Sequence, residues 1–535
     1  MLCVLALMPA RVAGASRAAN ANAREDVAQF GARVAAILAG PQARRAYWGI
    51  LVTDRGTGET LYSLNEDHFF TPASNAKLIV TAMALATLGP NYRFRTTLES
   101  DGRLGPGGKL SGDLILVGRG DPDLSNRIFP FAGEFERQGA PDKIFAEMVD
   151  AAVAKGLREV DGNIVGDDSY FPYDPYPAGW SVGDLFFDFG VPASAITFND
   201  NVVSIEIQPG LRPDDPATIT TQPAASLATL AHQVTTGAAN GMPQIAVVRQ
   251  PGDNFLLVRG TVPAGHAPVR LDLAMIAPAE TAARAVKDLL ESRGVRVTGG
   301  VRVRHSAPPE TLANGEPILP PARPSPEIHQ LVLAEHLSPP LLESIELTNK
   351  ISQNLHAEIF LRTIGREKLG LASTAAGLKV ERGFLQSAGV PDGDVVMSDG
   401  SGLARDDLVT PRAMVDLLRY AAHAPWGRDF ISTLPVSGED GTLNDRLRNS
   451  PATGRIEAKT GSTEHVHSLS GYATTVRGES LVFSIFCNND AQHGPSATKP
   501  LDQIATAMVE TFGAASMNKA PAANKPISAK SRREQ

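Results

Sequence analysis

The chain has little cysteine, few aromatic residues and no apolar run long enough to cross a membrane. Cys3 and Cys487 are its only two cysteines, so neither a disulfide framework nor a cysteine-rich metal site is expected. Aromatic residues make up 6% of the chain, against 39 Pro and 49 Gly, which favours many turns over a helical bundle. Membrane-embedded and fibrous proteins are thereby excluded.

The chain also has no large excess of positive or negative charge. The 50 Lys and Arg residues face 58 Asp and Glu residues, a formal net charge of −8. This mild acidity offers no general attraction to phosphate backbones, so no nucleic-acid partner is expected. The length of 535 residues predicts about three domains.

The two ends of the sequence carry features that indicate where the protein is located. An apolar stretch from Leu2 to Ala10 leads to Ala13-Gly14-Ala15, the small-residue pattern that precedes signal-peptidase cleavage. We predict a signal peptide over 1–15 and an exported, periplasmic protein without a transmembrane anchor. Residues 515–535 lose all periodicity and predict a disordered tail, whose basic residues can associate peripherally with a membrane or wall surface.

Hydrophobic periodicity distinguishes helical from strand-like segments along the chain. It predicts helices at 26–38, 73–88, 142–155, 280–293, 340–364, 375–388, 411–421 and 501–511. It predicts strands within 46–64, in short runs across 93–304, and at 455–459, 468–476 and 481–487. A Pro-rich connection at 317–326 indicates a domain boundary.

The first candidate for chemistry is Ser74-Asn75-Ala76-Lys77. A spacing of three places the hydroxyl and the amine on one helix face, and Thr71 and Pro72 are expected to cap that helix. The positive helix end favours an alkoxide, and a partly desolvated Lys77 can accept the proton. The pattern is weak alone, because it recurs at 496–499, where no long apolar helix follows.

The second candidate is Ser352-Gln353-Asn354, just ahead of the amphipathic run 355–364. Its hydroxyl can relay a proton to a leaving amine, and its amide can hold a substrate carbonyl. The same pattern also fits an ordinary helix-entry cap, and it recurs at 63–65 and 516–518.

The third candidate is Lys459-Thr460-Gly461, which we place at the end of a strand. A lysine and a hydroxyl there can bind a carboxylate, while glycine permits close approach of a peptide backbone. A plain strand-to-turn exit is the alternative, although no other Lys-Thr-Gly occurs in the chain.

The order of the three motifs is far more specific than any one of them, since Ser-x-x-Lys, Ser-x-Asn and Lys-Thr-Gly together typify penicillin-binding proteins and class A β-lactamases. Ser74 and Ser352 lie 278 residues apart, whereas Ser352 and Lys459 lie 107 apart, so a long segment is inserted. The layout closely resembles the low-molecular-mass class C penicillin-binding proteins, the D-Ala-D-Ala carboxypeptidase/endopeptidase family S13. Matching stretches are VGRGDPDL (117–124), ASAITFNDNVVSIEIQP (193–209), NKISQNLHAE (349–358), DGSGLAR (399–405), LPVSGEDGTL (434–443) and AKTGS (458–462).

The resemblance implies an α+β fold, with a β-lactamase/transpeptidase-like domain in which helices flank an antiparallel sheet. We predict that residues 24–92 and 328–514 form this domain and that 93–327 form two inserted β-rich accessory domains. No metal or organic cofactor is expected, since the chain has no His-Glu-x-x-His motif and no Cys/His cluster.

The resemblance also implies a serine acyl-enzyme mechanism on peptidoglycan stem peptides and cross-links, with β-lactams as covalent inhibitors. Ser74 is then the nucleophile, Lys77 the base, Ser352 the proton relay and Asn354 the group that orients the substrate amide. Lys459 and Thr460 would hold the terminal carboxylate, with Gly461 beside them, and the backbone N–H groups of Ser74 and Ser462 would hold the oxyanion.

Two further substrate contacts come from alignment with the family. Asp167 and Arg405 would bind the amine and the carboxylate of a diaminopimelate side chain; their alternatives are a turn residue and a surface ion pair. Glu464 stands where relatives carry Gln, which leaves the side-chain preference open. The competing functions are a β-lactamase or esterase with the same Ser-Lys pair, and a catalytically weak peptidoglycan-binding scaffold.

Overall fold

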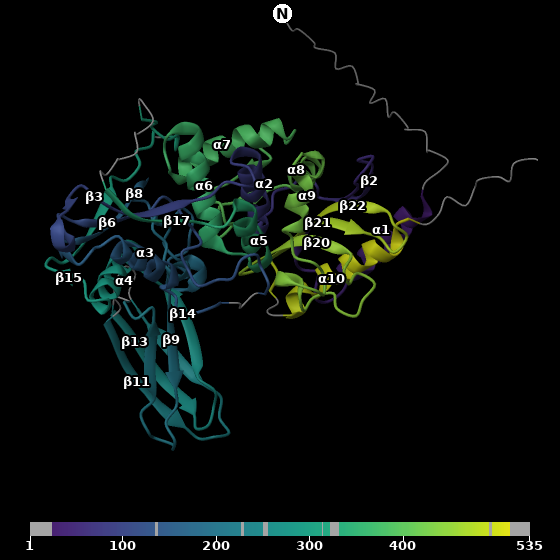
Figure 1. Ribbon diagram of the computed structural model, residues 1–535. Coiled ribbons are helices and arrows are strands. Elements are labelled where there is room, and N and C mark those ends of the chain that lie inside the picture. The colour runs from purple at the N-terminus through teal and green to yellow at the C-terminus, as the bar shows by residue number, and fades with distance from the viewer. Residues whose placement is uncertain are drawn as a thin grey trace, which may run out of the picture.

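The computed structural model describes residues 24–133, 137–225, 229–249, 255–312, 314–320, 331–491 and 495–513 (Figure 1). The predicted signal peptide and the predicted disordered tail lie outside these residues.

A five-stranded antiparallel sheet joins the two ends of the chain. Its strand order is β2 (Thr60–Leu64), β1 (Tyr47–Asp54), β22 (Ser480–Asn488), β21 (Val466–Thr474) and β20 (Ile456–Thr463). Helices α1 (Glu25–Leu38) and α10 (Pro495–Thr511) pack against each other and against one face. The first and last described segments therefore lie together, and the Gly513 N–H donates to the Asp26 carboxylate.

The opposite face of this sheet carries a cluster of helices. These are the 3-10 turn η1 (Ala73–Ala76) with α2 (Lys77–Thr87), then α5 (Leu341–Ile351), α6 (Asn354–Leu369), α7 (Thr374–Ser387), α8 (Pro411–His423) and α9 (Gly427–Ser432), with the short pair β18 (Val395–Val396) and β19 (Leu408–Val409). Helix α2 is buried over nine consecutive residues, so it forms the centre of the helical layer. Its neighbours α5 and α6 follow the inserted segment in the chain.

The inserted segment, between the two parts of the chain that form the five-stranded antiparallel sheet and its helices, has sheets and helices of its own. A mixed sheet runs β16 (Val301–Ser306), β8 (Ile164–Pro172), β6 (Leu114–Val117), β3 (Arg95–Ser100) and β17 (Leu331–Leu337), beside a smaller sheet of β15 (Arg296–Val297), β7 (Glu159–Asp161), β5 (Lys109–Ser111) and β4 (Arg103–Leu104). Helices α3 (Lys143–Ala154) and α4 (Pro278–Ser292) cover it, and together they enclose a separate hydrophobic core.

Two three-stranded sheets form a β-sandwich that projects from the body of the molecule (Figure 1). One contains β10 (Thr218–Gln222), β9 (Val202–Gln208) and β14 (Val269–Ala274); the other contains β11 (Thr229–Gly237), β13 (Phe255–Pro263) and β12 (Gln244–Val248). Ile205, Val234 and Val258 lie in the small core between them.

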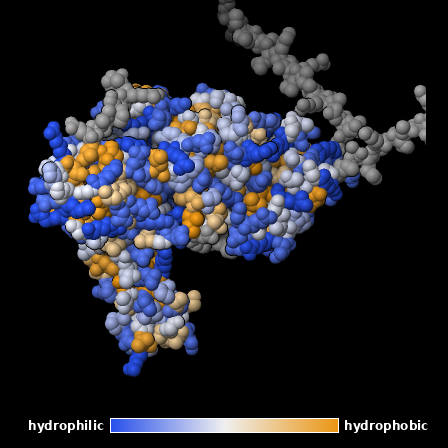
Figure 2. All heavy atoms as spheres, viewed as in Figure 1, coloured by the Kyte–Doolittle hydropathy of each residue, from blue (hydrophilic) through white to orange (hydrophobic). Residues whose placement is uncertain are grey.

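On the face shown in Figure 2, hydrophilic atoms predominate and hydrophobic ones occur in small, separate groups. Among the residues described above, no helix combines the length and the apolar character needed to span a bilayer.

The predicted α+β class is confirmed, but three local expectations are corrected. The helix expected at 340–364 is two helices, because Ser352 has a left-handed φ of 64° between them. Strand β20 continues to Thr463, because its ladder with β21 runs through Lys459 and Gly461. The expected Thr71 cap is absent, since a 3-10 turn without a side-chain cap precedes α2.

Strand β17 bears on the domain division. It lies within the range 328–514 assigned to the catalytic domain, yet it pairs antiparallel with β3 of the inserted segment. Because a shared ladder belongs to one folding unit, we propose the same division with the second boundary after Leu337.

Candidate active site

Ser74 sits in a tight, backbone-strained turn at the start of α2. The preceding Ala73 has a φ of 49° and is fully buried, a conformation that costs about 1–3 kcal/mol and persists only under packing from neighbours. Gly402 supplies that packing, since a Cβ there would lie 1.9 Å from the Ala73 carbonyl oxygen. The turn leaves Ser74 partly exposed while Lys77, one turn on, is buried.

Lys77 is the centre of the site. Its Nζ donates to Ser74 Oγ at 2.9 Å, to Asn354 Oδ1 at 2.6 Å and to the Ser401 carbonyl at 2.6 Å. Asn354 and Ser401 come from segments remote in sequence from Ser74 and Lys77, so the amine is held in one position. An amine held beside a serine hydroxyl is arranged to take its proton.

Burial lowers the pKa of Lys77 to about 7, against the opposing influence of Asp399, Glu358 and Asp407. The charged ammonium loses its water on burial, and these three carboxyl groups restore only part of that loss. The amine is therefore neutral in a large fraction of molecules near neutral pH, as a general base must be.

This pKa predicts how acylation depends on pH. Below about 7, Lys77 is mostly the ammonium and cannot accept a proton, so the second-order rate of β-lactam acylation should rise about tenfold per pH unit and level off above 7. Stopped-flow acylation with a fluorescent penicillin between pH 5 and 8.5 measures this. A rate that is flat or falls with rising pH across 5–7 would contradict Lys77 as the base.

Ser352 and Asn354 form the second side of the site. The left-handed backbone of Ser352 ends helix α5 before α6 begins. The Ser352 Oγ accepts a hydrogen bond from Lys459 Nζ at 2.8 Å. Asn354, at the start of α6, presents Oδ1 to Lys77 and donates from Nδ2 to the Phe189 carbonyl at 2.7 Å. The two residues thus touch both lysines of the cluster.

Strand β20 forms the third side. The Asn75 side chain donates to the Lys459 carbonyl at 3.0 Å, which links the strand to the turn that carries Ser74. Gly461 lies against that turn, since a Cβ there would be 3.0 Å from Ser74 N and 2.7 Å from the Pro72 carbonyl oxygen. Close approach to this turn, and not a strand exit, is the structural reason for glycine here.

Lys459 and Thr460 are held by neighbours on the strand and beyond it. Lys459 is fully buried and also donates to the Thr460 carbonyl at 2.9 Å, while Thr460 Oγ1 donates to Thr442 Oγ1 at 2.7 Å. Burial, together with repulsion from Lys77, holds the pKa of Lys459 well below its usual range. Two neighbouring buried ammonium groups are costly, so this cluster is suited to binding an anion.

A loop outside the three motifs supports Lys77. The Asp399 carboxylate accepts from the N–H groups of Ser401, Gly402, Leu403 and Ala404, and from Trp180 Nε1 at 2.7 Å. It thereby aims the Ser401 carbonyl at Lys77 and joins the loop to the inserted segment. The stretch DGSGLAR carried a family match in the sequence, but only the fold reveals this role.

Neither of the two predicted subsite residues, Asp167 and Arg405, hydrogen-bonds a residue of the three motifs within the described chain. Asp167 is buried in β8, where its carboxylate pairs with Arg304 at 2.9 Å and accepts from Ser169. Arg405 follows the Asp399 loop, is 37% exposed and lies 3.7 Å from Asp184 of the inserted segment. Arg405 thus faces solvent near the loop, whereas Asp167 is already paired within its own sheet.

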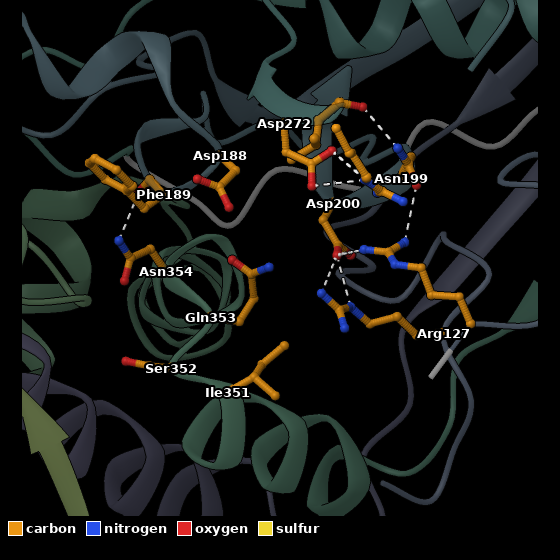
Figure 3. Close-up of a pocket in the computed structure, with 13 residues that line it drawn as sticks. Arg127, Asp188, Phe189, Asn199, Asp200, Asp272, Ile351, Ser352, Gln353 and Asn354 are labelled. Carbon is orange, nitrogen blue, oxygen red and sulfur yellow. Dashed lines mark hydrogen bonds and ion pairs between the residues drawn. The ribbon is translucent and has the colours of Figure 1, made fainter. Parts of the chain in front are cut away.

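A cavity of about 370 Å³ begins at the second motif (Figure 3). One wall is the segment 351–354, including Ser352 and Asn354; the other comes from the inserted segment, with charged side chains from Arg127, Arg137, Asp188, Asp200, Arg270 and Asp272. The catalytic cluster therefore opens into a polar space that the accessory domains build.

Comparisons with known proteins agree with this geometry. The model of the "D-Ala-D-Ala carboxypeptidase 3 (S13) family" matches residues 30–508. A D-alanyl-D-alanine carboxypeptidase of an Actinomadura species is 34% identical over 523 residues, covering 96% of this chain and 90% of the relative. D-alanyl-D-alanine carboxypeptidase DacB of Haemophilus influenzae is 28% identical and covers 82% of this chain and 85% of the relative. The crystal structure of penicillin binding protein 4 (dacB) from that organism superposes with a TM-score of 0.72 at 25% identity, covering 90% of this chain and 98% of the other.

Proposed function

Because this chain belongs to the D-Ala-D-Ala carboxypeptidase 3 (S13) family, as its motif order predicted, we propose that it cleaves peptidoglycan peptides through an acyl-enzyme on Ser74. The observation that carries the proposal is the buried Lys77 amine, 2.9 Å from Ser74 Oγ and with a pKa of about 7. The substrates are stem peptides, which lose their terminal D-Ala, and cross-links, which are cut by the same chemistry.

In acylation, Ser74 Oγ attacks the carbonyl carbon of the penultimate D-Ala while its proton passes to Lys77. The oxyanion is stabilised by the backbone N–H groups of Ser74 and Ser462. The position of Gly461 against Ser74 N supports this pairing, because it brings the backbone of β20 beside the nucleophile turn.

The leaving nitrogen then needs a proton. Ser352 relays to it the proton that Lys77 took from Ser74, the C–N bond breaks, and the ester on Ser74 remains. Asn354 holds Lys77 through Oδ1 and donates one N–H of Nδ2 to the Phe189 carbonyl, so the second N–H of Nδ2 can be donated to substrate. Lys77 is again neutral and can accept a proton from the water that hydrolyses the ester.

The terminal carboxylate is bound by Lys459 and Thr460. Its negative charge raises the pKa of Lys459 and keeps that lysine protonated. The carboxylate and the protonated Lys459 offset each other's charge, so burial remains the main influence on the pKa of Lys77.

We place the enzyme outside the cytoplasm, in the periplasm, where cross-linked peptidoglycan is found. The predicted signal peptide over 1–15 supports export. β-Lactams are expected to acylate Ser74 because they imitate the D-Ala-D-Ala terminus; penicillin binding protein 4 of Haemophilus influenzae has been crystallised in complex with a β-lactam.

Incubation of the purified protein with cross-linked muropeptides, with mass spectrometry of the products, tests the proposal. We expect release of D-Ala and conversion of dimers to monomers, and a single penicillin adduct on the peptide that contains Ser74. Absence of both products would refute the peptidase function. Rapid turnover of a chromogenic cephalosporin, without a lasting adduct, would instead favour the β-lactamase alternative.

A further inference from the structure

The cavity beside the second motif lies on one particular side of the reacting bond. Its walls include Ser352, the relay to the leaving nitrogen, and the side chain of Gln353 points into it, while Ser74 and Thr460 are not among its walls (Figure 3). Whatever is attached to the leaving nitrogen through its own side chain therefore extends toward this space.

The two reactions of the proposed function differ in what they place there. When D-Ala leaves, its carboxylate is held by Lys459 and its side chain is only a methyl group. When a cross-link is cut, the leaving residue carries a second peptide strand on its side chain. A methyl group leaves the cavity empty, whereas a strand must pass into it.

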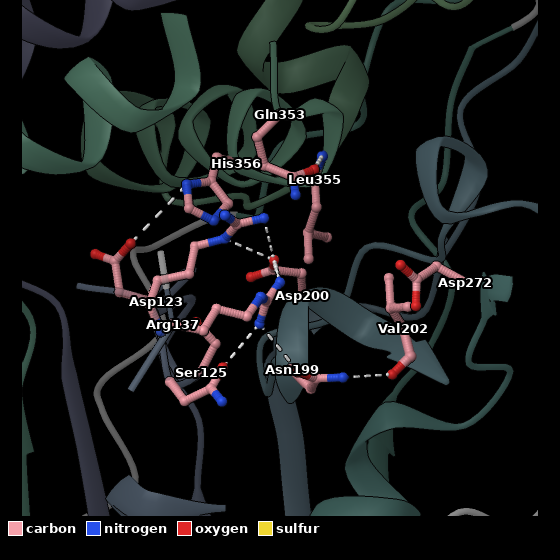
Figure 4. A network of polar contacts seen from close by, with 12 residues as sticks. Asp123, Ser125, Arg137, Asn199, Asp200, Val202, Asp272, Gln353, Leu355 and His356 are labelled. Carbon is pink, nitrogen blue, oxygen red and sulfur yellow. Dashed lines mark hydrogen bonds and ion pairs between the residues drawn. The ribbon is translucent and has the colours of Figure 1, made fainter. Parts of the chain in front are cut away.

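The inner end of the cavity is built to hold polar groups. Asn199, Asp200 and Asn201 are three successive buried residues with φ values of 52°, 56° and 55°, a strained left-handed turn that the surroundings must maintain. This turn presents Asp200, which is 2% exposed and pairs through Oδ2 with Arg127 at 2.8 Å and Arg137 at 2.6 Å (Figure 4). Its other oxygen, Oδ1, is buried and has no hydrogen-bond partner among the described residues, so a ligand donor can satisfy it.

The outer end carries charge of both signs. Arg270 on β14 is 53% exposed and bonds Asp272 and Ser204, and Asp188, in a 3-10 turn with Phe189, also lines the cavity. An arginine at the mouth can bind a peptide carboxylate, and carboxylates can accept from peptide N–H groups. This combination suits a peptide strand with a free carboxyl end.

We propose that this cavity binds the second, leaving peptide strand of a cross-link, with Arg270 on its carboxylate and with Asp188 and Asp200 on its N–H groups. The inference rests on the proposed function. It assigns to the accessory segment a specificity role: the cavity serves cleavage of cross-links and is not used in release of D-Ala.

Arg270→Ala tests this, with Arg259→Ala as the matched control. Arg259 is also exposed, lies on β13 of the same sandwich and is not part of the cavity wall. For Arg270→Ala we expect kcat/KM for a cross-linked dimer to fall about fivefold, the effect of one partly exposed charge-assisted contact, and the loss to shrink with added salt. D-Ala release from a short, uncharged-side-chain peptide and penicillin acylation should stay within about twofold of wild type. Asp188→Asn should likewise lower cleavage of the dimer and leave D-Ala release from the short peptide unchanged.

Four results are decisive. Unchanged dimer cleavage in both variants, or equal loss on dimer and short peptide, would overturn the inference while leaving the proposed function intact. The same loss in Arg259→Ala would also overturn it, because the effect would then be one of overall charge. If wild type cleaves neither substrate, the proposed function itself fails, and so does the inference that rests on it.

Discussion

Replacing Ser74 by alanine is expected to abolish D-Ala release, dimer cleavage and penicillin labelling together. The three reactions share one bond-forming step, attack by Ser74 Oγ, and no other hydroxyl contacts Lys77 Nζ among the described residues. Loss of a nucleophile from a catalytic unit lowers kcat by about 10⁴- to 10⁶-fold, because the remaining groups stabilise a reaction that no longer has its attacking atom.

The matched control is Ser496→Ala, which removes the serine of the other Ser-x-x-Lys sequence. We expect wild-type activity and labelling for this variant. Intact-mass measurement after penicillin treatment separates the two cases, since the adduct should persist in Ser496→Ala and vanish in Ser74→Ala. A labelled Ser74→Ala protein would show that another residue is acylated, and the assigned nucleophile would be wrong.

Lys77→Met is expected to lower the acylation rate by about 10³-fold, within the range for loss of a general base. Methionine has similar length and fills the buried space, so the packing beside Asn354 and Ser401 changes little while the proton acceptor is lost. Lys77→Arg should not rescue the rate, because a guanidinium stays protonated at every working pH. Stopped-flow acylation rates, with thermal unfolding as a check on folding, measure both variants.

The control here is Lys143→Met, which removes an exposed lysine at the start of α3. Its acylation rate should match that of wild type. If Lys77→Met remains folded and still acylates within tenfold of wild type, the proton of Ser74 must go elsewhere, and Lys459 would become the alternative acceptor.

Elements with strong periodicity were predicted nearly residue for residue. The predicted strand 481–487 is one residue shorter at each end than β22, and the predicted helix 26–38 begins one residue late compared with α1. The errors lie where tertiary contacts override local preference. Ser352 is held left-handed between two helices, and Ala73 is held in a conformation that its own sequence disfavours.

The candidate site divides in the same way. Residues recognisable by type and order, such as Ser74, Ser352 and Lys459, could be found in the sequence. Asp399 and Trp180 could not, because their contribution is a set of hydrogen bonds between segments that only the fold brings together. Asp167 was chosen by alignment, and only the structure reveals Arg304 already paired with it.

The sequence by itself determined the chemistry. The order of three motifs and their spacing predicted the family, the candidate nucleophile and the long insertion, because catalysis needs those residue types wherever the fold puts them. Only the tertiary structure decided how they act. Burial sets the pKa of Lys77, and strand β20 places Lys459 against Ser352. Residues of the inserted segment and of the second motif line a common cavity. Desolvation and distance depend on residues far apart in the chain, so neither can be read from a local pattern.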